Sequence, residues 1–161
     1  MLMLKNNFKR NIIYTLIFVL IFSADRLSKL YILNLAEMND SLNLYLTSFL
    51  NFYLIWNKGI AFGLFSFDQN LVYNLITSLI IFITVIILII AIKSKDYKGY
   101  FFLSIFSGSA GNLYDRIYYS AVPDFIDFHL NDFHWFIFNV ADIFISLGVI
   151  CLIFVEIFFK K

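Results

Sequence analysis

The sequence predicts an all-α membrane protein, a bundle of four transmembrane helices that carries a small extracytoplasmic β-sheet and an amphipathic loop. Three observations predict this class. Of the 161 residues, 61% are hydrophobic and only 14% are charged, which is more apolar surface than a soluble domain of this size can bury. Four apolar segments each have close to the ~20 residues that a helix needs to cross a bilayer. Between the first two segments, apolar and polar residues alternate, and this pattern favours strands.

The four segments organise the whole chain, which we interpret as a single membrane domain over residues 1–161. The first segment follows the basic stretch KNNFKR and also has some features of a cleaved signal peptide. However, the bulky Phe22 stands where cleavage requires a small residue, so we expect a retained helix. The predicted spans are about 11–35, 71–92, 97–116 and 135–159, and the predicted outer loops are 36–70 and 117–134.

The basic residues predict how these spans are oriented. Eight of the twelve lysines and arginines precede the first span, lie between the second and third, or end the chain. Because positively charged loops remain in the cytoplasm, we expect both termini there and both outer loops on the opposite side. The net charge of +1 gives no reason to expect nucleic acid as a partner.

Polar residues converge on the outer ends of the first and third spans. Asp25 and Lys29 lie four residues apart on one helical face, where they can pair, and Asn112, Asp115 and Arg116 share a face of the third span. One interpretation is a functional site at this level. The alternative is that Asp25–Lys29 and Asp115–Arg116 are ion pairs that only hold the bundle together.

The fourth span brings a carboxylate to the same level. Counting back from Phe159, the chain reaches Asp142 after about 26 Å of helix, and Asn139 lies one turn further out on the same face. A carboxylate at membrane depth is costly unless it is solvated, paired or protonated, which makes Asp142 a site hypothesis. The alternative is a helix-end residue at the level of the headgroups.

The first outer loop contains a predicted small sheet in its 41–65 segment. Apolar and polar residues alternate over 42–47 and again over 50–57, which is typical of strands with one apolar face. Asn57, Lys58 and Gly59 then favour a turn. We expect the sheet to rest on the membrane interface with its aromatic rings at headgroup depth. A simple connecting hairpin that faces the membrane fits the same pattern.

The second outer loop contributes acidic residues. Pro123 biases the preceding residue to an extended conformation, so Asp124 is expected in a fixed, non-helical segment and is the best partner in this loop for Asp142. The loop also contains other aspartates and histidines. A His/Asp metal site is one interpretation, but no spacing here is diagnostic of metal ligands, so we expect solvated loop residues and no bound metal. These residues are Asp127, His129, Asp132 and His134.

Two carboxylates in a small space favour acid–base chemistry. Both cannot ionise cheaply, so one holds a proton while the other acts as a base, and burial raises at least one of the pKa values. Such a pair can activate water against an amide and protonate the departing amine, while asparagine and arginine donors orient the carbonyl. A proton- or ion-coupled transporter and a non-catalytic assembly subunit are the alternatives, and composition alone does not single out peptide hydrolysis.

Five short motifs occur in order along the chain: DRLSK (25–29), NKGIAF (57–62), GNLYDR (111–116), VPDF (122–125) and FNVAD (138–142). In these motifs, its length and its four-span layout, the chain resembles lipoprotein signal peptidase, also called signal peptidase II, a family of bacterial intramembrane aspartyl peptidases. The motifs are similar to the family's D-x-x-[ST]-K, N-x-G-x-[AS]-F, G-N-x-x-D-R, V-x-D-F and F-N-x-A-D. The glycine-rich lead-in to GNLYDR is reduced to SGSA (107–110), and the proline often found before FNVAD is absent; both departures concern helix packing and substrate fit.

The resemblance implies an aspartyl endopeptidase that cleaves diacylglyceryl-modified prolipoproteins before the lipidated cysteine, without metal or cofactor. It implies a multi-pass protein of the bacterial cytoplasmic (inner) membrane with its active site at the outer leaflet. Its partners would be the prolipoproteins and membrane lipids, and we expect a monomer. The catalytic pair carries over to Asp124 and Asp142. The supporting residues carry over to Asn57, Gly59, Asn112, Asp115, Arg116 and Asn139, and to Asp25 and Lys29 of the first motif.

Overall fold

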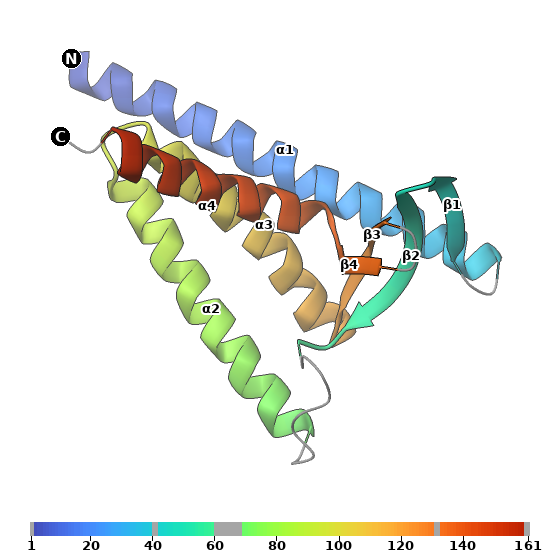
Figure 1. Cartoon of the computed structure of the whole chain (residues 1–161). Helices are drawn as coiled ribbons and strands as arrows, with labels where there is room; N and C mark the ends of the chain where they lie inside the picture. The colour runs from blue at the N-terminus through green and yellow to red at the C-terminus, as the bar shows by residue number, and fades with distance from the viewer. Residues whose placement is uncertain (1, 40–41, 60–68, 131–132, 160–161) are drawn as a thin grey trace.

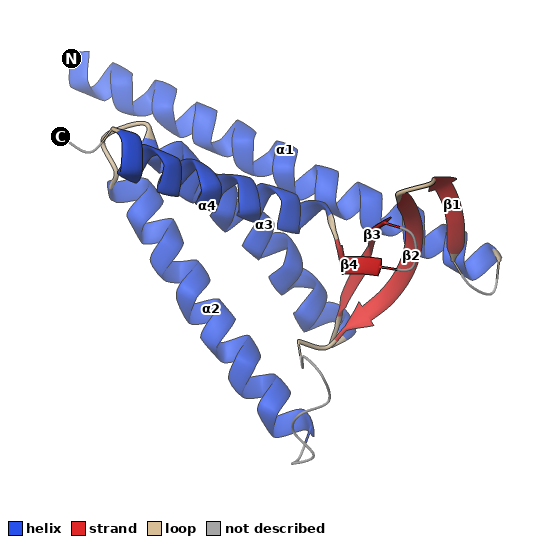
Figure 2. Ribbon diagram, viewed as in Figure 1, coloured by secondary structure: helices blue, strands red, loops and turns tan. Residues whose placement is uncertain are grey.

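The computed structural model describes residues 2–39, 42–59, 69–130 and 133–159. This part of the chain is mainly helical and contains one small antiparallel sheet (Figures 1 and 2). The helices are α1 (Leu2–Met38), α2 (Gln69–Lys93), α3 (Lys98–Tyr119) and α4 (Val140–Phe158). The strands are β1 (Asn43–Thr47), β2 (Leu50–Asn57), β3 (Val122–Leu130) and β4 (Phe133–Phe138).

Helix α3 is the centre of the bundle, because it packs against each of the other three helices, while α1 also contacts α4. Glycines allow α3 and α4 to approach closely. A Cβ on Gly108 would lie 2.5 Å from the carbonyl oxygen of Ala141, and one on Gly148 would lie 2.9 Å from that of Phe101. Figure 1 shows both chain termini at one end of the bundle and the sheet at the other.

The sheet joins two parts of the chain that are far apart in sequence. Its strand order is β1-β2-β3-β4 and every neighbouring pair is antiparallel. The β2–β3 pairing sets Ile55 opposite Asp124 and Asn57 opposite Val122, so the end of β2 lies beside the start of β3. A buried cluster of Ile32, Leu42 and Phe125 packs the sheet against α1.

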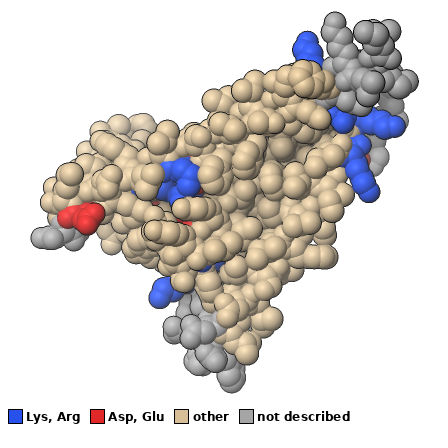
Figure 3. All heavy atoms as spheres, turned by 180° about the vertical axis from the view of Figure 1, so that it is seen from behind, with Lys and Arg blue, Asp and Glu red and all other residues tan. Residues whose placement is uncertain are grey.

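Among the residues that the structure describes, two helices have the length and composition of membrane spans: Leu71–Lys93 within α2, and Val140–Phe158 in α4. Only 11% and 17% of these stretches are buried inside the protein, so most of their apolar surface faces outward, as a bilayer requires. The face of the molecule in Figure 3 is largely uncharged, and many of its basic side chains gather at the end that carries the termini. The other two helices carry buried charged residues, Asp25 and Lys29 in α1 and Asp115 in α3.

Several predicted boundaries agree with the structure and others are wrong. The structure confirms the predicted positions of three elements, β1, β2 and α2. Residues 60–65 of the predicted sheet segment lie outside the described residues. The first and third helices are longer than predicted, 2–38 and 98–119. The fourth begins at residue 140 instead of 135, because the preceding apolar run forms β4, and β3 occupies half of the segment predicted as a loop.

Candidate active site

Asp142 lies in the first turn of α4, where its carboxylate is held by two donors. Asn139 is the N-cap residue, and its Oδ1 accepts from the Asp142 backbone N–H at 3.2 Å. In return the Asn139 backbone N–H donates to Asp142 Oδ2 at 3.1 Å, completing a capping box. The other carboxylate oxygen accepts from Asn112 Nδ2 on α3 at 2.8 Å. The side chain of Asp142 is thereby fixed by contacts from two elements.

Asp124 lies in β3 and is only 4% exposed. Its Oδ1 accepts from Asn139 Nδ2 at 2.6 Å, and its Oδ2 accepts from Asn57 Nδ2, at the end of β2, at 2.8 Å. Asn139 therefore contacts both aspartates, since its side chain donates to Asp124 and its backbone donates to Asp142. This one fully buried asparagine joins the sheet to the start of α4.

The environment of Asp124 favours its protonated form. Burial raises the pKa of this carboxyl from 3.8 to about 6, and the charge of Asp142 acts in the same direction, while the hydrogen bonds from Asn57 and Asn139 oppose the shift. Within the described residues, neither Asp124 nor Asp142 forms an ion pair with a lysine or arginine. Neutral amides hold both carboxylates, so no adjacent cation fixes either of them in the charged form.

The turn after β2 carries the next part of the site. The Gly59 N–H donates to Asn57 Oδ1 at 2.7 Å, which orients the Asn57 amide toward Asp124. Gly59 has φ +75°, a backbone conformation that favours glycine, and a Cβ there would lie 2.8 Å from Arg116 Nη1, so the guanidinium lies close against this turn. Arg116 lies over the Tyr73 ring at 6.0 Å, and its buried Nη1 has no hydrogen-bond partner among the described residues.

The charged residues of α1 and α3 form a buried cluster behind the aspartates. The predicted Asp25–Lys29 pair is confirmed at 2.9 Å. The alternative pairing of Asp115 with Arg116 is wrong, because Asp115 instead meets Lys29 at 2.7 Å and Arg26 at 2.6 Å. Consecutive helical residues point in directions about 100° apart, so Asp115 faces α1 while Arg116 faces the Gly59 turn. Arg26, which is not among the predicted site residues, is the second cation of this cluster.

Asp127 and His129, which were predicted to be solvated loop residues, lie in β3. Asp127 is 2% exposed in β3 and lies 3.9 Å from His129 Nδ1, so these two are not solvated loop residues. Asp132, and the side chain of His134, lie outside what the structure describes. Within the described part, no group of three His, Cys, Asp or Glu residues is placed to hold a metal ion.

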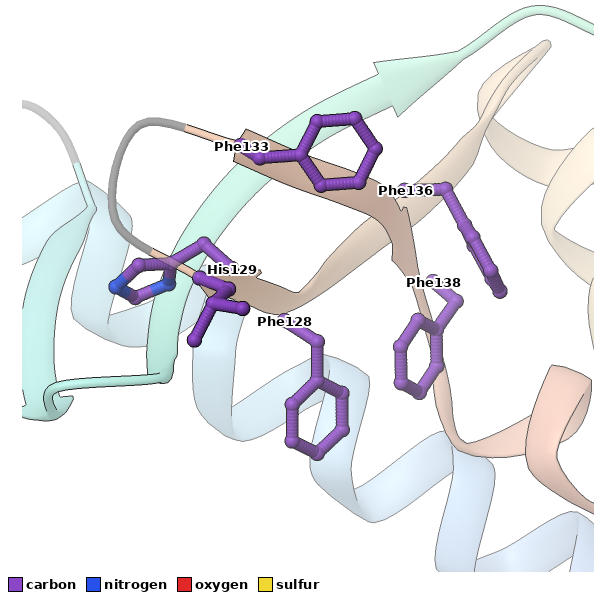
Figure 4. Close-up of a pocket in the computed structure, with 6 residues that line it drawn as sticks. Phe128, His129, Phe133, Phe136 and Phe138 are labelled. Atoms are coloured by element: carbon purple, nitrogen blue, oxygen red, sulfur yellow. The ribbon is translucent and has the colours of Figure 1, made fainter.

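A hollow of about 650 Å³ lies on the β3–β4 hairpin (Figure 4). Aromatic rings dominate its walls, and it does not include either of the two aspartates. Its lining residues are Phe128, His129, Leu130, Phe133, Phe136 and Phe138. Because β4 leads directly into the Asn139 cap, this aromatic surface adjoins the start of α4.

The chain matches the family model described as signal peptidase (SPase) II over residues 17–159. It is 55% identical over 157 residues to a lipoprotein signal peptidase of Pelagibacter ubique (strain HTCC1062), covering 98% of this chain and 95% of that protein. A lipoprotein signal peptidase of Anaplasma phagocytophilum (strain HZ) is 36% identical over 152 residues, covering 92% and 94%. A solved bacterial membrane enzyme aligns with a TM-score of 0.73 at 26% identity, covering 91% of this chain and 94% of that one. This chain therefore belongs to the signal peptidase II family of peptidases.

Proposed function

We propose that the protein is an aspartyl endopeptidase that removes the signal peptide from diacylglyceryl-modified prolipoproteins, cutting before the lipidated cysteine. Asp124 and Asp142 are the catalytic pair. The observation that carries the proposal is that Asn139 contacts both carboxylates, which brings two acids from separate elements to one point. Family membership supports the substrate class, since the related proteins are lipoprotein signal peptidases.

The proposed chemistry requires one protonated and one ionised carboxyl group. The ionised group removes a proton from water, which attacks the scissile carbonyl, and the protonated group supplies a proton to the departing nitrogen. The pKa of about 6 for Asp124 lies close to physiological pH, so this group can gain and lose a proton during turnover. No metal or cofactor takes part.

The charge that develops on the carbonyl oxygen needs a donor. Arg116 is the candidate, because its buried Nη1 lies beside the Gly59 turn, which is linked through Asn57 to Asp124. A guanidinium that is already in place, with part of its hydration removed, costs little further reorganisation as the charge forms. Asn57 fixes the orientation of the Asp124 carboxylate, and Asn112 fixes that of Asp142.

We also propose that all four helices cross the membrane, with both termini in the cytoplasm and the active site at the outer leaflet. The basic residues near the termini and the position of the sheet at the opposite end of the bundle support this orientation (Figure 1). The aromatic rings around the β3–β4 hollow would then lie at headgroup depth. The site would meet a substrate whose lipid anchor keeps it in that leaflet.

The test uses full-length protein in a neutral detergent with a diacylglyceryl-modified prolipoprotein. Wild type is expected to cleave before the lipidated cysteine, and Asp124→Asn and Asp142→Asn are each expected to lower the rate by about a thousandfold or more, as for loss of a general acid or base. Asp96→Asn, which removes an exposed carboxylate at the α2–α3 turn, is the matched control and should cleave normally. EDTA should leave the rate unchanged.

Two results would contradict the proposal. Normal cleavage by a folded Asp142→Asn protein would remove Asp142 from the catalytic pair. Failure of folded wild type to cleave the lipidated substrate would reject the peptidase, and proton-coupled transport would be measured next in sealed vesicles.

A further inference from the structure

We propose that Asp25 and Lys29 of α1 are positioning residues, which hold Asp142 in its working geometry through Asn112 and through the backbone at the start of α4. This inference rests on the proposed function, because it takes Asp142 as a catalytic residue. Neither α1 residue touches Asp142 in any contact that the described structure records. Lys29 acts through Asn112, which contacts Asp142, and Asp25 acts through the backbone next to Asp142.

The first connection runs from Lys29 to Asn112 to Asp142. Lys29 is fully buried, and its ammonium has three acceptors: Asp25 Oδ2 at 2.9 Å, Asn112 Oδ1 at 2.8 Å and Asp115 Oδ2 at 2.7 Å. These use all three of its N–H donors. Because Asn112 Oδ1 faces the ammonium, its Nδ2 must face away, and it donates to Asp142 Oδ1 at 2.8 Å.

The ammonium also excludes the flipped orientation of the Asn112 amide. A flip would set the amide NH₂ against Lys29, donor against donor, and the amide oxygen against the carboxylate of Asp142. Without Lys29, the first of these penalties is absent, and only the repulsion between the amide oxygen and the Asp142 carboxylate opposes rotation of the amide. Lys29 therefore adds to the preference for the one orientation in which Asn112 donates to Asp142.

The second connection runs from Asp25 to the backbone of α4. Asp25 Oδ1 accepts from the Ala141 N–H at 3.0 Å, while the next N–H, that of Asp142, is capped by Asn139. The first N–H groups of a helix have no partner within the helix. Asp25 thus caps α4 from another helix, and it fixes the backbone immediately before Asp142. Gly111 leaves room for it, since a Cβ there would lie 2.5 Å from Asp25 Oδ2.

The charges of this cluster are matched within it. Lys29 and Arg26 face Asp25 and Asp115, two cations and two carboxylates, and three of the four side chains are fully buried. The cluster therefore has no spare cation to form an ion pair with Asp142, and its hydrogen-bonded connections toward that residue run through a neutral amide and a backbone N–H. A cluster that served packing alone would not need these two contacts.

A double-mutant cycle on kcat tests the first connection. Lys29→Met and Asn112→Ala are each expected to lower kcat by about 10- to 100-fold, while KM changes by less than about twofold, because misplacement of the reacting groups affects the chemical step. If Lys29 acts through Asn112, the double variant should be no slower than Asn112→Ala, within about twofold. Losses that multiply would overturn the proposal. Lys98→Met, which breaks an exposed lysine–carboxylate pair with Glu156 at the other end of the bundle, is the matched control and should retain the wild-type kcat.

Further variants keep the test decisive if Lys29→Met does not fold. Lys29→Gln restores an N–H donor for Asn112 without a charge, so its kcat is expected to exceed that of Asn112→Ala, which has no donor to Asp142. Asn112→Asp still accepts from Lys29 but cannot donate to Asp142. A folded Asn112→Asp protein with wild-type kcat would overturn the proposal. If wild type itself does not cleave, the proposed function fails; if it cleaves but the two losses multiply, only this inference fails.

Discussion

The raised pKa of Asp124 makes protein stability depend on pH in a direction that can be calculated. In the unfolded chain this carboxyl has a pKa near 3.8, and in the folded protein burial raises the pKa to about 6. The folded state therefore holds the proton more tightly, so the stabilisation is fully present below 3.8 and is lost as pH rises through about 6. The complete effect corresponds to about 3 kcal/mol, of which about 2 kcal/mol is lost between pH 4.5 and 7.5.

The assay compares melting temperatures of wild type and Asp124→Asn in neutral detergent across this pH range. The variant has no titrating group at this position, so the difference between the two proteins removes the contribution of other groups. Relative to the variant, wild type is expected to lose roughly 4–8 °C between pH 4.5 and 7.5. A constant offset between the two proteins only reflects the changed hydrogen bonds. A difference that does not change with pH, or that grows in favour of wild type as pH rises, would refute the reasoning.

Three other substitutions have defined outcomes. Gly111→Ala should displace the Asp25 carboxylate, which would lie 2.5 Å from the new Cβ, and lower both the melting temperature and kcat, at a cost of about 1–3 kcal/mol in stability. Gly59→Ala should lower the cleavage rate by tenfold or more, because φ is +75° and Arg116 Nη1 lies 2.8 Å from the new Cβ. Normal cleavage by this variant would show that the turn does not support the site. Lys98→Met should change the melting temperature by less than about 4 °C, because exposed ion pairs contribute at most about 1 kcal/mol.

The parts of the fold that the sequence predicts well are those with a local pattern. Helix α2 is apolar on all sides and bounded by polar residues, and β1 and β2 alternate with period two, so their positions follow from short stretches. Strand β4 has no such boundary, because FHWFIF runs into the apolar helix that follows. The signal that marks the true start of α4 is the capping box of Asn139 and Asp142, which is legible in the sequence.

Pairings between distant segments cannot be predicted from local sequence patterns. Strand β3 pairs with β2 across two intervening helices, and no local pattern records this partner. The pairing of Asp115 is a similar case. Its neighbour Arg116 suggested an adjacent ion pair, yet adjacent residues on a helix do not face each other. Only the packing of α1 against α3 determines that Lys29 and Arg26 are the partners.

The use of amides around the two aspartates follows from what the proposed chemistry requires. A lysine or arginine in direct contact with a carboxylate favours its charged form and would oppose the proton that one member of the pair must hold. Asn57, Asn112 and Asn139 fix the carboxylates with a weaker bias toward the charged form than a cation would exert, since each donates a neutral N–H. The cations are set one residue further away, where Lys29 orients an amide and is itself neutralised by two carboxylates. Rigidity and a usable pKa are thereby supplied by different residues.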